Sequence, residues 1–387
     1  MYKIATLNNI SPAGLSCFND KYSITDNVDE AIGILVRSQD MLEMNFSKSL
    51  LAIARAGAGT NNIPLVRCAE EGIVVFNTPG ANSNAVKELV LAGLLLSARN
   101  LYSGINWTTS LTDDVCTTVE KGKGQFAGTE IKGKTLGVIG LGAIGVAVSN
   151  SAEALGMKVI GYDPFITWKA AHGLSNTVPI IKSIDDLFPS CDYISIHVPS
   201  ITETKGMINK ERFAQMKNGA VLLNFSRDNL VNDFDLLEAI DSGKVSRYIT
   251  DFPNDMLIGK KNIITIPHLG ASTEEAEDNC ALMAAEEMMD YLENGNITNS
   301  VNYPTASLGP FVSGSVQRIC ILNKNIPGVI GNITGILSES KINIEDLLNK
   351  SKGNFAYTLV DILSDIDEAD LKSKLTMDGI ISVRVLK

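Results

Sequence analysis

The chain of 387 residues has few of the residues that mark metal centres, disulfide scaffolds and membrane spans. It holds three histidines and six cysteines, and no two cysteines form a Cys-x-x-Cys pair or stand at metal-ligand spacing. Scattered single cysteines are typical of a reduced cytosolic protein. The longest apolar run, residues 89–96, is far shorter than the roughly 20 residues of a membrane helix. The N-terminus lacks the layout of a signal peptide. We predict a cytoplasmic protein without a metal site.

Positive charge is also scarce, with 33 Lys and Arg against 44 Asp and Glu and a net charge of -11. Such a chain is repelled by nucleic acid and by anionic membranes, and we expect neither as a partner. An anionic substrate would need a local basic pocket.

Short apolar runs alternate with helix-like segments over most of the chain, which is too long for a single core. The runs lie at residues 33–36, 72–76, 136–139, 158–162, 193–196, 220–223 and 263–266. This pattern predicts an α/β fold in which helices cover both faces of parallel sheets. We expect two doubly wound, Rossmann-like domains, the first from 1–98 and 281–303, the second from 99–280.

The pattern changes after a linker at 304–315, which carries Pro and Gly among polar residues. Residues 316–387 predict the order strand, helix, strand, strand, helix, strand, which is the split βαβ pattern of an α+β, ferredoxin-like domain.

The helix predicted over residues 84–98 is apolar on almost every face and therefore needs to be buried on every face. A subunit interface explains this, so we expect a homodimer or homotetramer. A helix enclosed within one large domain is the alternative.

A Gly-x-Gly-x-x-Gly turn follows the strand predicted at 136–139, and a helix begins inside it. Glycines let the backbone approach a pyrophosphate at the helix N-terminus. The residues predicted to form this site are Gly140, Gly142, Ala143, Ile144 and Gly145. Asp163 ends the next strand, where a carboxylate bonds the ribose hydroxyls and repels a 2′-phosphate. No Arg follows it, which favours NAD over NADP. A turn that only packs strand on helix is the alternative.

Two histidines stand at the ends of predicted strands, His197 before Val-Pro and His268 before Leu-Gly, whereas His172 lies in a polar stretch. Oxidation of an alcohol by hydride transfer needs a base for the hydroxyl proton, and a histidine near neutrality suits that task. It also needs a fixed cation at the substrate oxygen. Arg227, at the end of the strand over 221–225, is placed for this.

These motifs together resemble the D-isomer-specific 2-hydroxyacid dehydrogenases, in the branch that ends in an ACT domain. The resemblance covers the whole chain, and its motifs lie at residues 54–62, 77–79, 140–145, 161–164, 224–227, 250–253 and 267–273. It implies NAD-dependent oxidation of D-3-phosphoglycerate to 3-phosphohydroxypyruvate, the first step of the phosphorylated route to L-serine. The first domain would then bind the substrate, the second NAD, and 316–387 would be a regulatory ACT domain.

Two other functions stay open. The same fold serves dehydrogenases for other 2-hydroxy acids, such as glyoxylate or hydroxypyruvate reductases, and the ACT domain argues against these. A protein that senses NAD and amino acids without catalysis is the second alternative, against which stand Arg227 and His268.

The resemblance implies an Arg-Glu-His catalytic set, which Arg227 and His268 match. The acid falls on Met256, and the nearest carboxylate is Asp255. In the family this acid raises the pKa of the histidine. Either Asp255 takes its place through a shifted loop, or His268 works without an acid. Asp228 and the following Asn stand where many relatives have two glycines.

The remaining site residues also follow from the resemblance. The backbone N–H groups of Ala56 and Gly57 would bind the substrate carboxylate. Cations for the phosphate would be Arg37, Arg55, Lys121 and Lys123, each with a solvated surface charge as the alternative. Further cofactor contacts would come from Thr78, Val198, Pro199, Ser226, Asp251 and Gly270.

The loop after the first strand of the C-terminal domain resembles the ligand loop of ACT domains. Asn325 and Asn343 match two asparagines that hold L-serine between two ACT domains in serine-sensing relatives, and Asn323 stands where one branch has a histidine. L-serine is therefore the expected effector. An ACT domain kept only for assembly is the alternative.

Overall fold

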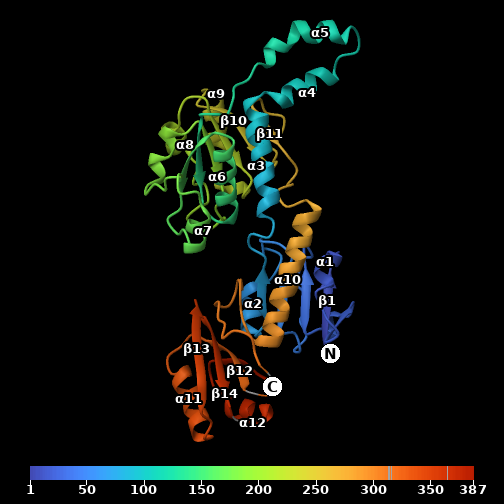
Figure 1. Ribbon diagram of the computed structural model, residues 1–387, viewed down its shortest axis with the longest axis vertical. Coiled ribbons are helices and arrows are strands. Elements are labelled where there is room, and N and C mark those ends of the chain that lie inside the picture. Colours follow the sequence, from blue (N-terminus) through green and yellow to red (C-terminus); the bar gives the residue numbers. More distant parts are fainter. Residues whose placement is uncertain (313, 315, 364) are drawn as a thin grey trace. The chain divides into compact units, whose positions relative to one another are not determined.

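The computed structural model describes residues 1–312, 314, 316–363 and 365–387, and its contacts divide the chain into two units (Figure 1). Unit 1 comprises Met1–Asn82 and Glu277–Lys387, and unit 2 comprises Ser83–Ala276. The predicted boundary at residue 98 thus differs from the observed division, which falls before helix α3 (Ser83–Ala98). The physical reason is that α3 packs on the helix and sheet of unit 2, where Gly93 approaches Leu223 and Phe225.

The sheet of unit 1 has five parallel strands in the order β2-β1-β3-β4-β5. Its strands are β1 (Tyr2–Leu7), β2 (Tyr22–Thr25), β3 (Gly33–Val36), β4 (Ala52–Arg55) and β5 (Val74–Asn77). The helices of this part are α1 (Pro12–Leu15), α2 (Leu65–Glu70) and most of α10 (Glu274–Asn294). All four residues of β3 are buried, as an apolar strand covered on both faces requires.

The sheet of unit 2 has six parallel strands in the order β11-β10-β9-β8-β6-β7. Its strands are β6 (Thr135–Ile139), β7 (Lys158–Tyr162), β8 (Tyr193–Ile196), β9 (Ala220–Asn224), β10 (Val245–Thr250) and β11 (Ile263–Thr265). Besides α3, its helices include α6 (Ala143–Ala154), α7 (Trp168–Gly173), α8 (Lys210–Gln215) and α9 (Asp233–Asp241). The strand order reverses between β6 and β8, and ligands of such sheets bind at this switch point.

An arm formed by α4 (Leu101–Thr109), α5 (Val115–Gly122) and the 3-10 helix η2 (Lys123–Phe126) follows α3. No residue of these three helices is buried in the described chain, and Figure 1 shows α4 and α5 as a hairpin. Leu95 of α3 is also exposed, so α3 is not buried on every face within unit 2. None of the described helices is both long and apolar enough to cross a membrane.

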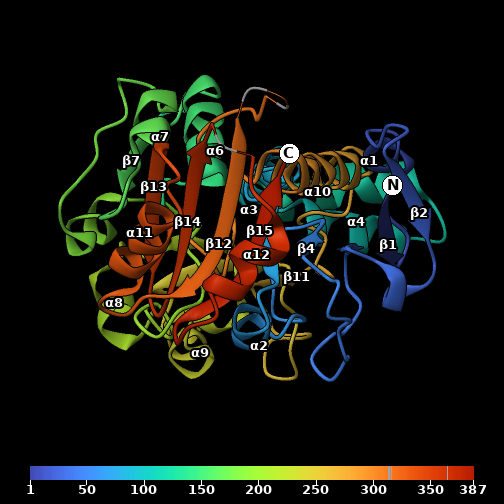
Figure 2. The same cartoon turned by 90° about the horizontal axis from the view of Figure 1, so that it is seen from below.

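The C-terminal domain has the expected ferredoxin-like fold, with an antiparallel sheet in the order β13-β14-β12-β15. Figure 2 shows β13, β14 and β12 side by side. The elements are β12 (Gln317–Lys324), α11 (Val329–Glu339), β13 (Ile344–Lys352), β14 (Phe355–Ile362), α12 (Glu368–Lys374) and β15 (Ile380–Leu386). Residues of α11 and α12 form an apolar core with β12, β14 and β15.

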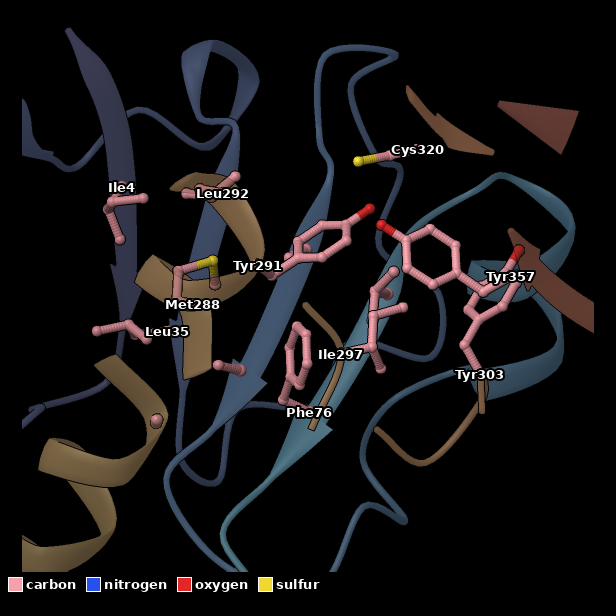
Figure 3. Packing of buried hydrophobic residues seen from close by; sticks show 14 of the residues in the cluster. Ile4, Leu35, Phe76, Met288, Tyr291, Leu292, Ile297, Tyr303, Cys320 and Tyr357 are labelled. Carbon is pink, nitrogen blue, oxygen red and sulfur yellow. The ribbon is translucent and has the colours of Figure 1, made fainter. Parts of the chain in front are cut away.

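A second apolar core joins this sheet to the rest of unit 1 (Figure 3). Cys320 and Tyr357 of the sheet lie in one cluster with Tyr291 of α10, Ile297 and Tyr303. The predicted linker 304–315 takes part, because Leu308 and Phe311 pack against the cluster. Residues 313 and 315 of that linker lie outside the described residues.

Two arginines of the C-terminal domain bind backbone carbonyls in the rest of unit 1. Arg318 is 2% exposed and forms two hydrogen bonds of 2.7 Å with the carboxylate of Asp361. Its Nη1 donates to the carbonyl oxygen of Asn294 over 2.8 Å. Arg384 donates to the carbonyls of Tyr291 and Leu292, which lie in the last turn of α10. The C-terminal domain is thereby fixed to the end of α10.

Candidate active site

The glycine turn after β6 has one open side. Gly140 has φ 93°, and a Cβ atom there would clash with the carbonyl of His197. A Cβ on Gly145 would clash with the Gly140 carbonyl, whereas one on Gly142 would meet nothing within 4 Å. Close packing therefore requires glycine at positions 140 and 145. The open space beside Gly142 leaves room for a ligand at the N-terminus of α6.

The ligand that fits this turn is a dinucleotide with a free ribose diol. Ala143 and Ile144 begin α6, and first-turn N–H groups have no helical acceptor. The Asp163 carboxylate accepts hydrogen bonds from the N–H groups of Leu141 and Phe165, each over 2.8 Å. These bonds hold the carboxylate beside the turn, and each oxygen keeps a lone pair for a ribose hydroxyl.

His197 lies at the end of β8, on the other side of the switch point. Its Nε2 is 2.8 Å from the Ser195 hydroxyl, and burial lowers its pKa to about 3. Burial disfavours the protonated ring that a base must form, so His268 rather than His197 is the candidate base. Val198 and Pro199 follow it directly, at the edge where a dinucleotide would lie.

Asp251 connects the residues around His268. Its carbonyl oxygen accepts from the N–H of His268 over 2.9 Å, and its Oδ2 accepts from the N–H of Gly270 over 3.1 Å. Burial raises the pKa of Asp251, against the opposing effects of the Gly270 N–H, His268 and Arg227. Its Oδ1 is buried without a partner among the described residues, which leaves an acceptor for a ligand amide. The ring of Phe252 packs 4.8 Å from the His268 ring.

Arg227 is exposed and follows the end of β9. Its carbonyl accepts from Asn224 Nδ2 over 2.8 Å, and its Nη1 donates to the carbonyl of Ser226 over 2.5 Å. Ser226 is buried, and its hydroxyl donates to the carbonyl of Ile196 at the end of β8. Hydrogen bonds therefore fix the loop that carries Arg227, and the guanidinium has further N–H donors that can bind a substrate oxygen. Asp228 begins the turn η5 (Asp228–Leu230).

Asp255 forms no hydrogen bond or ion pair with His268 within the described part of the chain. It is exposed, and no hydrogen bond or ion pair of its side chain occurs among the described residues. The loop around it is held by Asn254, whose Nδ2 donates to Asp233 over 2.7 Å and whose Oδ1 accepts from the N–H of Met256 over 3.0 Å. A pairing of Asp255 with His268 would need this loop to shift, and the role of Asp255 stays a prediction.

The turn after β4 in unit 1 carries the predicted carboxylate site. The N–H of Ala56 donates to the carbonyl of Val36, and the N–H of Gly57 donates to that of Arg55, each over 2.8 Å. Both predicted donors are thus engaged within the chain.

The next two N–H groups of this turn, those of Ala58 and Gly59, donate to no described residue. Their orientation is fixed from the end of β5, because Thr78 N–H donates to the Gly57 carbonyl over 3.2 Å and Asn77 Nδ2 to the Ala58 carbonyl over 2.6 Å. In a planar trans peptide the C=O and N–H groups point in opposite directions. Two adjacent N–H groups therefore face away from β5, which makes an anion site. The sequence did not predict that the N–H groups of Ala58 and Gly59 are the free ones. The motif Asn77-Thr78, whose side chain and backbone hold the turn, could have indicated it.

Two of the four predicted cations lie beside this turn. The guanidinium of Arg55 lies over Gly57, where any Cβ atom would clash with it. Its Nε donates to the carbonyl of Arg37 over 3.1 Å, and Arg37 pairs with Glu277 over 2.6 Å. The other two cations, Lys121 and Lys123, lie on the arm in unit 2.

The three predicted effector residues are separated within one chain. Asn323 is buried in β12, where its Oδ1 accepts from the Thr358 hydroxyl over 3.1 Å. Asn325 donates to the carbonyl of Gly353 over 3.0 Å, ahead of α11. Asn343 follows α11 and lines a hollow of about 400 Å³. Asn325 and Asn343 therefore lie beyond opposite ends of α11.

Comparison with known proteins gives one family. Residues 92–270 match the NAD binding domain of the D-isomer specific 2-hydroxyacid dehydrogenases. The chain is 30% identical to D-3-phosphoglycerate dehydrogenase 1 of Saccharomyces cerevisiae, with 96% of this chain and 83% of the relative covered. It is 33% identical to D-3-phosphoglycerate dehydrogenase of Haemophilus influenzae, with 92% and 86% covered.

A solved structure resembles about four-fifths of the chain. The NAD+-bound 3-phosphoglycerate dehydrogenase of Entamoeba histolytica superimposes with a TM-score of 0.61 at 27% identity, and the match covers 78% of this chain and 98% of that one.

Proposed function

The chain belongs to the D-isomer-specific 2-hydroxyacid dehydrogenases, and on that premise we propose that it oxidises D-3-phosphoglycerate to 3-phosphohydroxypyruvate with NAD⁺ as the cofactor. This is the first step of the phosphorylated route to L-serine. The observation that carries the proposal is the placement of Arg227, Asp251 and His268 at the carboxyl edge of the sheet that also bears the glycine turn. Relatives aligned over more than nine-tenths of the chain carry this activity in their names.

The proposed reaction removes a hydride and a proton from the alcohol at C2. When NAD⁺ is bound, it supplies the acceptor for the hydride. His268 takes the hydroxyl proton as the C2–O bond becomes a carbonyl. Arg227 holds the C2 oxygen and the neighbouring carboxylate by charge-assisted hydrogen bonds. Asp255 stays the predicted partner of His268, and a histidine that works without an acid is the alternative.

Substrate anions would bind at the turn after β4. We infer that the substrate carboxylate is received by the unpartnered N–H groups of Ala58 and Gly59, rather than by those of Ala56 and Gly57. Arg55 and Arg37 beside the turn, with Lys121 and Lys123 as the other predicted cations, would bind the phosphate. Arg55 and Arg37 supply local positive charge at this turn, which an anionic substrate needs on a chain of net charge -11.

We propose that the chain assembles as a homodimer or homotetramer through the arm and the outer side of α3. Leu101, Tyr102 and Ile105 of the arm are 43%, 49% and 58% exposed, and Leu95 of α3 is 43% exposed. Apolar residues grouped in this way mark interaction surfaces. The I105E variant should dissociate the assembly in sedimentation experiments, whereas an unchanged mass would place the interface elsewhere.

We propose L-serine as an effector that binds between two ACT domains. Asn325 and Asn343 lie beyond opposite ends of the 11-residue helix α11, so one molecule of serine would need Asn325 of one chain and Asn343 of another. The contacts of Arg318 and Arg384 with α10 give the effector a route to the substrate-binding residues. An ACT domain that serves only assembly is the alternative, and L-serine titration of the initial rate separates the two.

The test of the proposed activity is NADH formation by the purified chain from NAD⁺ and D-3-phosphoglycerate. The expected result is turnover that the H268A variant loses. NAD⁺ binding without turnover of any 2-hydroxy acid would favour a sensing protein. We place the reaction in the cytoplasm, where the six free cysteines would stay reduced.

A further inference from the structure

A carboxyl group with no role in the proposed chemistry is buried in α10. Glu287 is 7% exposed, and burial raises its pKa to about 8. Its Oε1 accepts from Asn299 Nδ2 over 2.6 Å, and its Oε2 is buried without a partner among the described residues. Among the described residues, the only charged group that shifts the pKa of Glu287 is Glu286, which is exposed on the same helix. No charged group on β5 or on residues 296–302, which pack against α10, shifts this pKa within the described chain. In the part of the chain that the structure describes, the buried carboxyl thus has one hydrogen-bond partner, Asn299.

Asn299 connects Glu287 to the end of β5. It adopts the left-handed conformation with φ 54°, and its carbonyl accepts from the N–H of Asn77 over 3.4 Å. The next residue, Ser300, pairs antiparallel with Phe76. Figure 3 shows Phe76 and Ile297 in the shared apolar cluster, so the segment that carries Asn299 is packed along β5.

Asn77 extends the connection to the anion turn. Its side chain holds the Ala58 carbonyl over 2.6 Å, and this carbonyl belongs to the same peptide unit as the N–H of Gly59. Because that unit is planar, the bond from Asn77 also sets the direction of the Gly59 N–H.

We propose that Glu287 is a positioning residue for the substrate anion, acting through Asn299 and Asn77 on the peptide unit between Ala58 and Gly59. The inference rests on the proposed function, since the anion is the carboxylate of D-3-phosphoglycerate. Without an acceptor at position 287, the partly buried Asn299 amide loses its hydrogen bond and the segment at the end of β5 loses a constraint. An N–H group that already points toward the anion binds it more tightly than one that must first be oriented, because no conformational freedom is lost on binding.

The test compares E287L with E287Q, which keeps an acceptor oxygen of the same reach. E287L should raise KM for D-3-phosphoglycerate about fivefold, as loss of one hydrogen bond predicts. Its kcat and its KM for NAD⁺ should stay within about twofold, since the contact lies outside the nucleotide site. E287Q should restore the native KM, and E286Q, which changes the exposed neighbour, should match the native protein.

A second variant covers the case in which E287L fails to fold. N299G removes the amide and keeps the left-handed conformation that glycine adopts without strain. It should raise the same KM, and N299G/E287Q should raise it no further. A native KM in E287L and N299G, or an equal rise in E287Q and E287L, would overturn the inference.

Amide hydrogen exchange across residues 56–60 gives a readout that does not need turnover. E287L or N299G should exchange faster there, and E287Q and E286Q should not. If the native protein forms no NADH, the proposed function fails, and unchanged exchange in both E287L and N299G would refute the positioning role independently.

Discussion

The backbone N–H of His268 donates to the carbonyl oxygen of Asp251 over 2.9 Å. The carboxylate of the same Asp251 accepts from the N–H of Gly270, two residues further on. One buried residue at the end of β10 thus holds the backbone at and after His268. The proposed base therefore stands on a strand end rather than on a free loop, which suits a group that must meet a substrate hydroxyl at a defined distance.

Replacement of His268 should remove the proton acceptor and leave the backbone contacts in place. We expect H268N to lower kcat by about 10²- to 10⁴-fold, the usual contribution of a general base. NAD⁺ affinity, measured by titration calorimetry, should stay within about twofold of the native value. An H268N variant that retains most of the native kcat would remove His268 from the mechanism.

Replacement of Asp255 decides between the two forms of the catalytic set. If Asp255 partners His268 through a shift of the loop that Asn254 holds, D255N should move the pH–rate profile, and an unshifted profile would remove Asp255 from the mechanism. A partner carboxylate would raise the pKa of His268, so its loss would move the limb of the profile to lower pH. Such a shift in D255N, with N254A as the control for loop position, would assign the acid to Asp255.

Replacement of Asp163 should weaken the preference for NAD⁺. D163S removes the negative charge beside the glycine turn and shortens the side chain that now accepts from the Leu141 N–H. We expect the ratio of kcat/KM for NAD⁺ to that for NADP⁺ to fall at least about tenfold, which corresponds to roughly 1.4 kcal/mol. An unchanged ratio would mean that Asp163 does not contact the ribose.

Part of the fold was predictable from single runs of residues. The runs 158–162 and 193–196 form β7 and β8 with the expected bounds, since apolar segments between polar turns suit strands, and β8 is buried along its whole length. β10 was not predicted, because Ser246 and Arg247 interrupt its apolar run. The arm was also missed, since its apolar residues are not buried in the described chain and follow no core periodicity.

Part of the candidate site was predictable for the same reason. The glycine turn and Asp163 follow from local spacing, because each is set by the strand that precedes it. The free N–H groups of Ala58 and Gly59 were not predictable, because hydrogen bonds from Asn77 and Thr78 decide which amides of the turn are engaged. Such contacts arise only once β4 and β5 are paired.

The ionisation of Glu287 should make stability depend on pH. Its pKa rises from 4.5 to about 8 on folding, so the folded state keeps a proton that the unfolded chain releases. This contribution is fully present below pH 4.5 and is lost as the pH rises through about 8. E287Q has no ionisable group at this position. As the pH rises over this window, the unfolding free energy of E287Q should therefore increase relative to that of the native protein by up to a few kcal/mol. Urea titrations at several pH values test this, and parallel curves would contradict it.

The ion pair of Arg318 and Asp361, which joins β12 to β14, should stabilise the ACT domain. R318M leaves Asp361 nearly buried without a partner, which costs about 3–5 kcal/mol of unfolding free energy. Removing both charges in R318M/D361L should recover most of that loss. K372M, which breaks the exposed pair with Glu368, is the control and should change little. Equal urea midpoints for R318M and K372M would show that the buried pair is dispensable.

The most direct test of the central claim is the ratio of kcat/KM for D-3-phosphoglycerate to that for D-glycerate, measured as NADH formation with NAD⁺. Two charge-assisted hydrogen bonds to the phosphate, at roughly 1.5–3 kcal/mol each, predict a ratio of about 100 or more. NADH formation that is faster with the unphosphorylated acid, or absent with both acids, would contradict the account.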